Sequence, residues 1–195
     1  MKYFICSDIH GSESACKTAL TFYNELKCDK LLLLGDILYH GPRNDLPQGH
    51  NPKGVIALLN PLADKIIACR GNCEAEVDQM VLNFSCLGDF FQIIDDGVTI
   101  FGTHGHVYAP TRSDGSIPTG CETANKKINV TNPAIILYGH THVSVLEKND
   151  KGQIICNPGS VSLPKGGTEA GFAIYEDHKI SLYNLTGKEL KTINF

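Results

Sequence analysis

The chain has 195 residues, of which 42% are apolar and 19% charged, and its formal net charge is −4. This is an ordinary globular composition, which excludes an intrinsically disordered chain and a membrane protein. The negative charge argues against a broad nucleic-acid-binding surface and leaves open a local basic groove. A chain of this length can bury roughly 70% of its unfolded surface in one core, so we predict a single domain over residues 1–195.

The N-terminal residues Met-Lys-Tyr-Phe-Ile-Cys lead directly into polar residues and lack the apolar length and cleavage site of a signal peptide. No run approaches the ~20 apolar residues that a membrane-spanning helix needs. We therefore expect a cytoplasmic protein. Its eight cysteines include no Cys-x-x-Cys pair, which argues against a zinc ribbon or thioredoxin motif. We expect most of them to be reduced core residues.

The first half of the chain alternates predicted strands and helices. Residues 2–7 form an apolar run, and Ser12 is the expected N-cap of the amphipathic helix that follows. The Leu-rich residues 30–34 indicate a strand covered on both faces. Asn51-Pro52 are expected to begin a second helix, and residues 65–69 form the next strand. This β-α-β-α-β order predicts a parallel sheet with right-handed crossovers.

The second half is predicted to consist mainly of strands. Residues 90–95 and 98–103 flank Asp96-Gly97, which is typical of a hairpin turn. Further strands are expected at residues 135–138, 144–147, 154–156, 172–175 and 179–183. We predict an α/β fold in which two mixed β-sheets pack face to face with helices outside, an αββα four-layer sandwich. Two long irregular connections, residues 40–52 and 105–120, each follow a candidate ligand, so we expect them to wall the functional site.

Metal-compatible side chains follow these predicted strands. They are Asp8, His10, Asp36, Asn72, His104, His140 and His142. In an extended segment alternate side chains share one face, so both members of a pair two residues apart can reach one ion. A single such pair is also compatible with a polar strand end, and Asp36 after Gly35 with a helix cap or turn. Their joint occurrence at strand ends favours a metal site, in which the two oxygens of one carboxylate can bridge two ions.

These motifs resemble those of the calcineurin-like metallophosphoesterases. The residues that carry the resemblance are Asp8-x-His10, Gly35-Asp36, Gly71-Asn72-Cys73-Glu74, Thr103-His104-Gly105-His106 and Gly139-His140-x-His142. Three longer segments, beginning at Asp36, Arg70 and Asn157, are similar to the small bacterial YfcE-type phosphodiesterases. The resemblance extends from Met1 to about Gly171.

The resemblance implies two divalent metal ions. One would be held by Asp8, His10 and His142. The other would be held by Asn72, His104 and His140. Asp36 would bridge them. The family uses manganese, iron, zinc, nickel or cobalt, and we expect Mn²⁺. Two ions neutralise an anionic phosphodiester and lower the pKa of a bridging water towards ~7, which predicts in-line attack by that water or hydroxide.

Other predicted catalytic residues lie beside the ligands. Cys73 replaces a histidine that assists the leaving group in most superfamily members, although YfcE-type proteins also have cysteine here. A nucleophilic role for Cys73 stays open. His106 could act as an acid or phosphate donor, or be a loop histidine. Arg43 could grip phosphate with its paired donors, together with Asn44, or be an exposed loop arginine.

We therefore predict a phosphodiesterase that hydrolyses small phosphodiesters. The alternatives are a phosphomonoesterase or nuclease with the same metal site, and a non-catalytic protein-interaction scaffold of this fold. Membrane and nucleic-acid partners are not expected, and a homo-oligomer stays open. The acidic residues Glu74, Glu76 and Asp78 are expected to form the first turn of a helix, with catalysis as the alternative. Lys165-Gly166-Gly167 is expected to form a turn, with a position near the site as the alternative.

Overall fold

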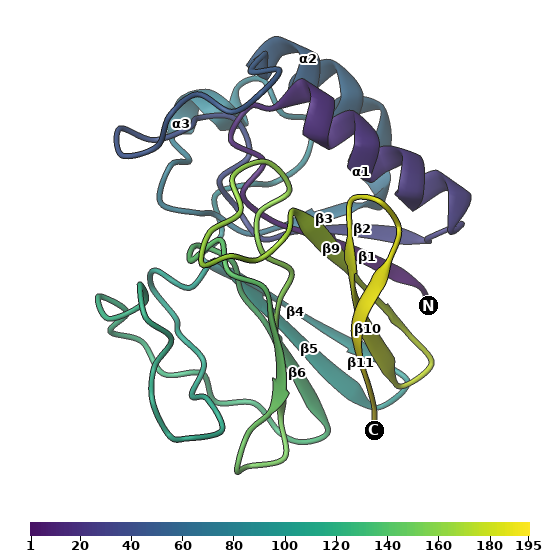
Figure 1. The fold of residues 1–195 in the computed structure, drawn as a ribbon, viewed down its shortest axis with the longest axis vertical. Coiled ribbons are helices and arrows are strands. Elements are labelled where there is room, and N and C mark those ends of the chain that lie inside the picture. Colours follow the sequence, from purple (N-terminus) through teal and green to yellow (C-terminus); the bar gives the residue numbers. More distant parts are fainter.

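Two mixed sheets pack face to face in the computed structural model, which describes residues 1–195 (Figure 1). The first sheet contains six strands in the order β11-β10-β9-β1-β2-β3. Their bounds are β1 Tyr3–Cys6, β2 Lys30–Leu33, β3 Ile66–Ala68, β9 Gly171–Glu176, β10 Lys179–Asn184 and β11 Glu189–Asn194. Strands β1, β2 and β3 are parallel, and the C-terminal strands extend the sheet in antiparallel fashion from β1.

The second sheet contains five strands in the order β4-β5-β6-β8-β7. Their bounds are β4 Phe90–Asp95, β5 Val98–Thr103, β6 Ala134–Leu137, β7 Val145–Lys148 and β8 Ile154–Asn157. Strands β5, β6 and β8 are parallel, with an antiparallel strand at each edge. The parallel strands therefore form one half of the first sheet, up to its β3 edge, and the centre of the second. The carboxyl ends of the parallel strands define one rim in each sheet.

Alternation along the strands divides the core into layers. In β1, Tyr3 and Ile5 face the second sheet, whereas Phe4 and Cys6 face the helices. Helices α1 (Glu13–Glu25) and α2 (Pro52–Leu59) cover that outer face, and the one-turn α3 (Glu76–Gln79) lies nearby (Figure 1). A 3₁₀ helix, Asn60–Lys65, connects α2 to β3. Burial of these apolar side chains on both faces of one sheet holds the strand ends in fixed positions.

The outer layers differ from the predicted arrangement on one side. Helices flank only the first sheet. The outer face of the second sheet is covered by the irregular segment 104–133, whose Cys121, Ala109 and Ile128 pack against Ile136 and Ile155 (Figure 1). The predicted pair of face-to-face mixed sheets is confirmed, but the fourth layer is made of loop. The apolar residues of that segment are scattered and do not recur at the three- to four-residue spacing of an amphipathic helix.

Most predicted elements are confirmed within one or two residues. Ser12 caps α1 by accepting a hydrogen bond from the Ala15 amide at 3.2 Å. The Asp96-Gly97 turn joins β4 to β5 with positive φ at both residues. Strand β11 was not predicted, because this edge strand carries mainly polar and charged residues. All eight cysteines are free, and all except Cys73 are buried. No helix has the length and apolarity required to cross a bilayer.

Candidate active site

The predicted metal ligands gather where the parallel strands of both sheets end. Asp8 follows β1, Asp36 follows β2, and Asn72 follows β3 in the first sheet. His104 and His140 follow β5 and β6 of the second sheet. The prediction that distant motifs converge on one rim agrees with this arrangement.

The backbone at these positions is not extended. The expectation that the side chains of each pair share one face of an extended segment is therefore wrong. The left-handed region is occupied at five ligand positions, with φ of 55° at Asp8, 50° at His10, 54° at Asp36, 68° at His140 and 59° at His142. Non-glycine residues seldom adopt this conformation, and functional sites are where it concentrates. The side chains of each pair therefore converge through turns beyond the strand ends, and not through strand alternation.

Asp8, His10 and His142 form a buried cluster. The Nε2 atoms of His10 and His142 are 3.1 Å apart, and they lie 3.6 and 3.3 Å from Oδ1 of Asp8. All three side chains are at most 3% exposed. These three donor atoms are close enough to bind one ion.

A second cluster contains Asp36, Asn72 and His104. His104 Nε2 lies 3.5 Å from Asp36 Oδ2 and 3.2 Å from Asn72 Oδ1. Asp36 Oδ2 also lies 3.6 Å from Nε2 of His10, so this carboxylate faces both clusters. The His140 ring lies 5.0 Å from that of His104, between centroids, beside the second cluster.

Backbone carbonyls fix the orientation of three histidines. The Nδ1 atoms of His10, His104 and His142 lie 2.8, 2.6 and 2.6 Å from carbonyl oxygens. A carbonyl only accepts hydrogen bonds, so each Nδ1 must carry the proton. In the neutral ring the Nε2 lone pair then points into the cluster. Histidine ligands in metal sites are commonly oriented by such a hydrogen bond.

The donor set fits divalent cations. Oδ1 of Asp8 is buried and has no hydrogen-bond partner in the protein. Two histidine lone pairs facing each other at 3.1 Å also need a shared cation or a proton between them. Buried polar atoms left without a partner are costly, and a cation among imidazoles and carboxylates removes that cost.

Charge coupling sets the protonation of this site. Burial alone would raise the pKa of Asp8 and Asp36, but the surrounding histidines, His104 first, hold both values below the usual range. Burial lowers the pKa of His104, and the carboxylates of Asp36 and Asp8 outweigh it and raise the value to about 9. Without metal, His104 is therefore protonated at neutral pH.

Metal loading should consequently release protons. A cation needs the His104 lone pair, so we expect Mn²⁺ binding at pH of about 7.5 to expel about one proton or more, and fewer at pH of about 10, where the ring is already neutral. Calorimetric titration in buffers of different ionisation enthalpy measures this number. His178→Gln, a change at a half-buried histidine outside the site, should leave it unaltered. Equal proton release at both pH values would contradict the assignment of His104.

Glu74 has a role that the sequence interpretation missed. It precedes α3, is 8% exposed, and accepts hydrogen bonds from the amides of Asp36, Ile37 and Gly71. Burial, followed by the Asp36 charge, raises its pKa to about 6. Glu74 therefore ties the end of β2 to the end of β3. Only Glu76 and Asp78 belong to the predicted helical turn.

A second set of polar contacts holds the histidine loop and Asp8. The side-chain Nδ2 of Asn157 donates to the Gly139 carbonyl at 2.9 Å and to Thr141 Oγ1 at 3.0 Å. The hydroxyls of Ser160 and Ser162 donate to the Asp8 carbonyl at 2.7 and 3.0 Å. The segment that begins at Asn157 thus positions ligands without contributing one. The Asn-Pro-Gly-Ser sequence of residues 157–160 is the feature from which this positioning role could have been predicted.

Cys73 borders the metal cluster. Its amide donates to Asp36 Oδ1 at 2.9 Å, and its Sγ accepts from Asn72 Nδ2 at 3.3 Å. Burial, and then the neighbouring Asp36 carboxylate, raise the thiol pKa. The thiol is therefore protonated at neutral pH, which disfavours a thiolate nucleophile.

His106 lies beside the histidine ligands without joining them. Its ring centroid is 5.3 Å from that of His104 and 6.1 Å from that of His140. Burial, and then the charge of His104, lower its pKa to about 4. A neutral His106 can donate a hydrogen bond to phosphate but is a poor source of protons near pH 7.

An open cleft of about 410 Å³ lies over Asp36, Asn72, His140 and His142. Arg43 and Asn44 of the first long loop line one side, and Thr119 and Gly120 of the second line another, as expected for loops that wall the site. Lys165, which was interpreted as part of a turn, also lines the cleft and donates to Asn44 Oδ1 at 3.1 Å. Two cationic side chains therefore face the cleft.

The family model for the calcineurin-like phosphoesterase superfamily domain matches residues 1–179. The chain belongs to this superfamily. Phosphodiesterase YfcE of Escherichia coli (strain K12) is 38% identical over 191 residues, which cover 97% of this chain and 95% of that protein. The solved structure of YfcE, described as a phosphoesterase from E. coli, superposes with a TM-score of 0.88 at 36% identity and covers 99% of this chain and 98% of that one.

More distant solved structures share the fold. Wild-type Vps29 of Entamoeba histolytica, complexed with Zn²⁺, has a TM-score of 0.57 at 16% identity, covering 99% of this chain and 98% of that one. Identity this low shows the fold alone. The calcineurin-like superfamily and the YfcE relationship are confirmed, and the Asp and His cluster is compatible with a dinuclear divalent-metal site.

Proposed function

We propose that this protein is a dinuclear metal-dependent phosphodiesterase acting on small phosphodiesters. The observation that carries the proposal is the pair of adjoining clusters around Asp36, within a chain 38% identical to a phosphodiesterase. Asp8, His10 and His142 would hold one ion. Asn72, His104 and His140 would hold the other, and Asp36, which faces both clusters, would be their shared ligand.

The two ions would supply neutralisation of the phosphate oxygens and a water-derived nucleophile at neutral pH. Substrate binding and orientation would be carried out by the side chains of the cleft. Arg43 and Lys165 attract the anionic diester into the cleft and orient its free oxygens. His106 donates a hydrogen bond to phosphate, and Asn44, fixed by Lys165 and by the His40 carbonyl, holds the loop in place. The identity of the metal, with Mn²⁺ as our expectation, belongs to this proposal.

Chelation tests the proposal directly. Protein stripped with a chelator should lose hydrolysis of an aryl phosphodiester and regain it when Mn²⁺ is added, since the donor set has no substitute for a cation. Rates are measured by release of the aryl alcohol, with elemental analysis of each sample. Zn²⁺, Ni²⁺, Co²⁺ and Fe²⁺ are added in parallel. Activity that is indifferent to both treatments would refute the proposal.

Replacement of Cys73 tests which group attacks phosphorus. Because the thiol is protonated and water supplies the nucleophile, Cys73→Ser should keep turnover within about tenfold of the wild type. Cys73→Ala serves as the companion variant. Steady-state rates are compared at equal metal content. Complete loss in both variants with metals retained would assign the chemistry to sulfur.

A phosphomonoesterase is the second candidate, and Lys165 is the observation that favours it. A monoester carries an additional negative charge, and the cleft offers a second cation beside Arg43. Comparing aryl mono- and diesters in Lys165→Gln separates the two: selective loss of monoester hydrolysis supports this candidate. A scaffold role would require a stoichiometric protein partner and no bound metal. The single-domain extent over residues 1–195, the cytoplasmic location and the oligomeric state stay predictions.

A further inference from the structure

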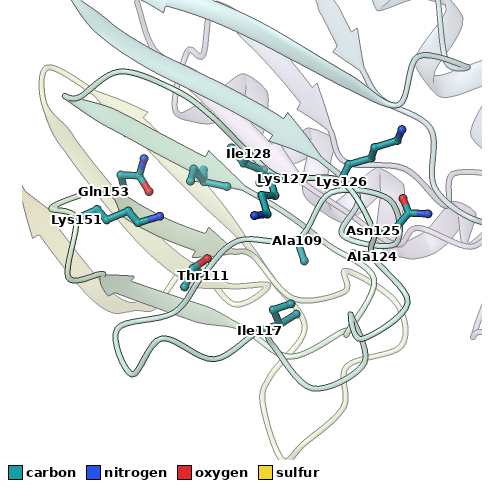
Figure 2. A pocket seen from close by; sticks show the side chains of 11 residues that line it. Ala109, Thr111, Ile117, Ala124, Asn125, Lys126, Lys127, Ile128, Lys151 and Gln153 are labelled. Atoms are coloured by element: carbon teal, nitrogen blue, oxygen red, sulfur yellow. The ribbon is translucent and has the colours of Figure 1, made fainter.

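A second pocket lies on the outer face of the second sheet and shares no residue with the catalytic cleft (Figure 2). It has a volume of about 400 Å³ and lies between strand β6, the connection from β7 to β8 and the covering segment 104–133. Its apolar part is formed by Ile136, Ala109 and Ile128, which belong to one buried cluster with Cys121. The size is in the range of pockets that hold small molecules.

The pocket is cationic although the chain as a whole is anionic. Lys126, Lys127 and Lys151 are among its lining residues, and none of the lining residues is acidic. None of the three ammonium groups makes an ion pair, whereas Arg112 nearby is paired with Glu147. Figure 2 shows the amino groups of Lys127 and Lys151 reaching the same space from different segments, while that of Lys126 points away. Two unpaired cations therefore face one cavity.

Neutral donors in the pocket also lack acceptors. Gln153 is 8% exposed, and its Oε1 accepts from Asn149 Nδ2 at 3.1 Å, which leaves the Nε2 donors without a protein acceptor. The hydroxyl of Thr111 also lines the pocket and makes no side-chain hydrogen bond either. The Gln153 amide is thus held in place by Asn149 while its Nε2 donors stay accessible, beside lysines that are themselves exposed.

We propose that this pocket binds a small organic anion whose oxygens meet Lys127, Lys151 and Gln153, and whose apolar body lies on Ile136 and Ala109. Charge-assisted hydrogen bonds from ammonium groups to carboxylate, sulfonate or phosphate oxygens supply the polar part of the affinity. The apolar wall supplies the remainder through burial. This site is independent of the proposed hydrolase activity.

The probe is 2-naphthalenesulfonate, which carries an anionic group on an apolar body and is a poor metal ligand. It is titrated into the Zn²⁺-loaded protein by calorimetry, with backbone-amide NMR shifts recorded in parallel, since Zn²⁺ is diamagnetic. We expect saturable binding, with the largest shifts in segments 109–111, 124–128 and 151–153. In the double variant Lys127→Gln/Lys151→Gln the affinity should fall by about tenfold or more, because two charge-assisted contacts are removed.

The matched control is Lys17→Gln/Lys188→Gln, which removes two exposed lysines elsewhere and should bind like the wild type. Neutral 2-naphthalenemethanol and inorganic sulfate should each bind more weakly than the sulfonate, since each lacks half of the recognised chemistry. Equal affinity in the lysine double variant, or shifts confined to the cleft residues, would overturn the proposal. Tighter binding of a single-stranded oligonucleotide through the same lysines would also overturn it and assign the site to nucleic acid. Thermal unfolding confirms that each variant is folded.

Discussion

Asp36→Ala should abolish both metal binding and hydrolysis. Its carboxylate faces His10 and His104 at 3.6 and 3.5 Å, so its removal takes one ligand from each cluster together with the negative charge between them. We expect the metal content to fall sharply and the diesterase rate to drop by at least about a thousandfold. Elemental analysis and steady-state kinetics on the same preparation measure both quantities.

The controls for Asp36 separate charge from shape. Asp36→Asn keeps the size and one oxygen but loses the charge, and should behave like the alanine variant in metal content. Asp45→Ala removes an exposed carboxylate from the adjoining loop and should leave metal content and rate unchanged. Two ions still bound to Asp36→Ala, with activity near the wild-type rate, would show that this side chain is not the bridge.

Glu74→Ala should produce the largest loss of stability outside the apolar core. The buried carboxylate accepts from three backbone amides, and alanine leaves all three without an acceptor. Each buried unsatisfied donor costs roughly 1–3 kcal/mol, so we expect the free energy of unfolding to fall by about 3 kcal/mol or more. Urea unfolding of the metal-free protein measures this change. Metal affinity should fall as well, because the turn carrying Asp36 is no longer tied to Gly71.

Glu76→Ala is the matched control for Glu74, since Glu76 is exposed on α3 two residues further along the chain. Its stability and metal affinity should equal those of the wild type. Glu74→Gln retains one acceptor oxygen and should give an intermediate loss. Unfolding free energies for Glu74→Ala within about 0.5 kcal/mol of the wild type would mean that water replaces the carboxylate at these amides.

The sequence was sufficient to locate the strands near the site because each ligand motif follows an apolar run. The Leu-rich run before Asp36 is β2, and the hairpin signal at Asp96-Gly97 correctly joined β4 to β5. The positions of the candidate ligands could be proposed from the sequence because each motif is local in the chain. The conformations that aim them could not, because positive φ at residues such as Asp8 is imposed by contacts with Ser160 and Gly35.

Long-range roles escaped sequence interpretation for the same reason. Glu74 has the acidic character expected of a first helical turn, and only the approach of β2 to β3 turns it toward the Asp36 amide. Lys165 lies in a glycine-rich segment that does fold into turns, yet its amino group reaches Asn44, 121 positions earlier in the chain. The prediction of helices outside the second sheet was wrong, and nothing local in the sequence argued against it. Residues 104–133 lack helical periodicity, but that alone does not show that they cover the sheet as loop.

The irregular segment that covers the second sheet can vary in sequence without changing the strands that carry the proposed metal ligands. Segment 104–133 begins at His104 and contributes Thr119 and Gly120 to the cleft, but its interior participates in no regular sheet or helix. Insertions or exchanges beyond His106 in this segment would leave the strand register and the proposed metal ligands intact. Related proteins could therefore acquire new substrate preferences through substitutions in this one irregular segment, while the residues proposed to cleave the phosphorus–oxygen bond stay the same.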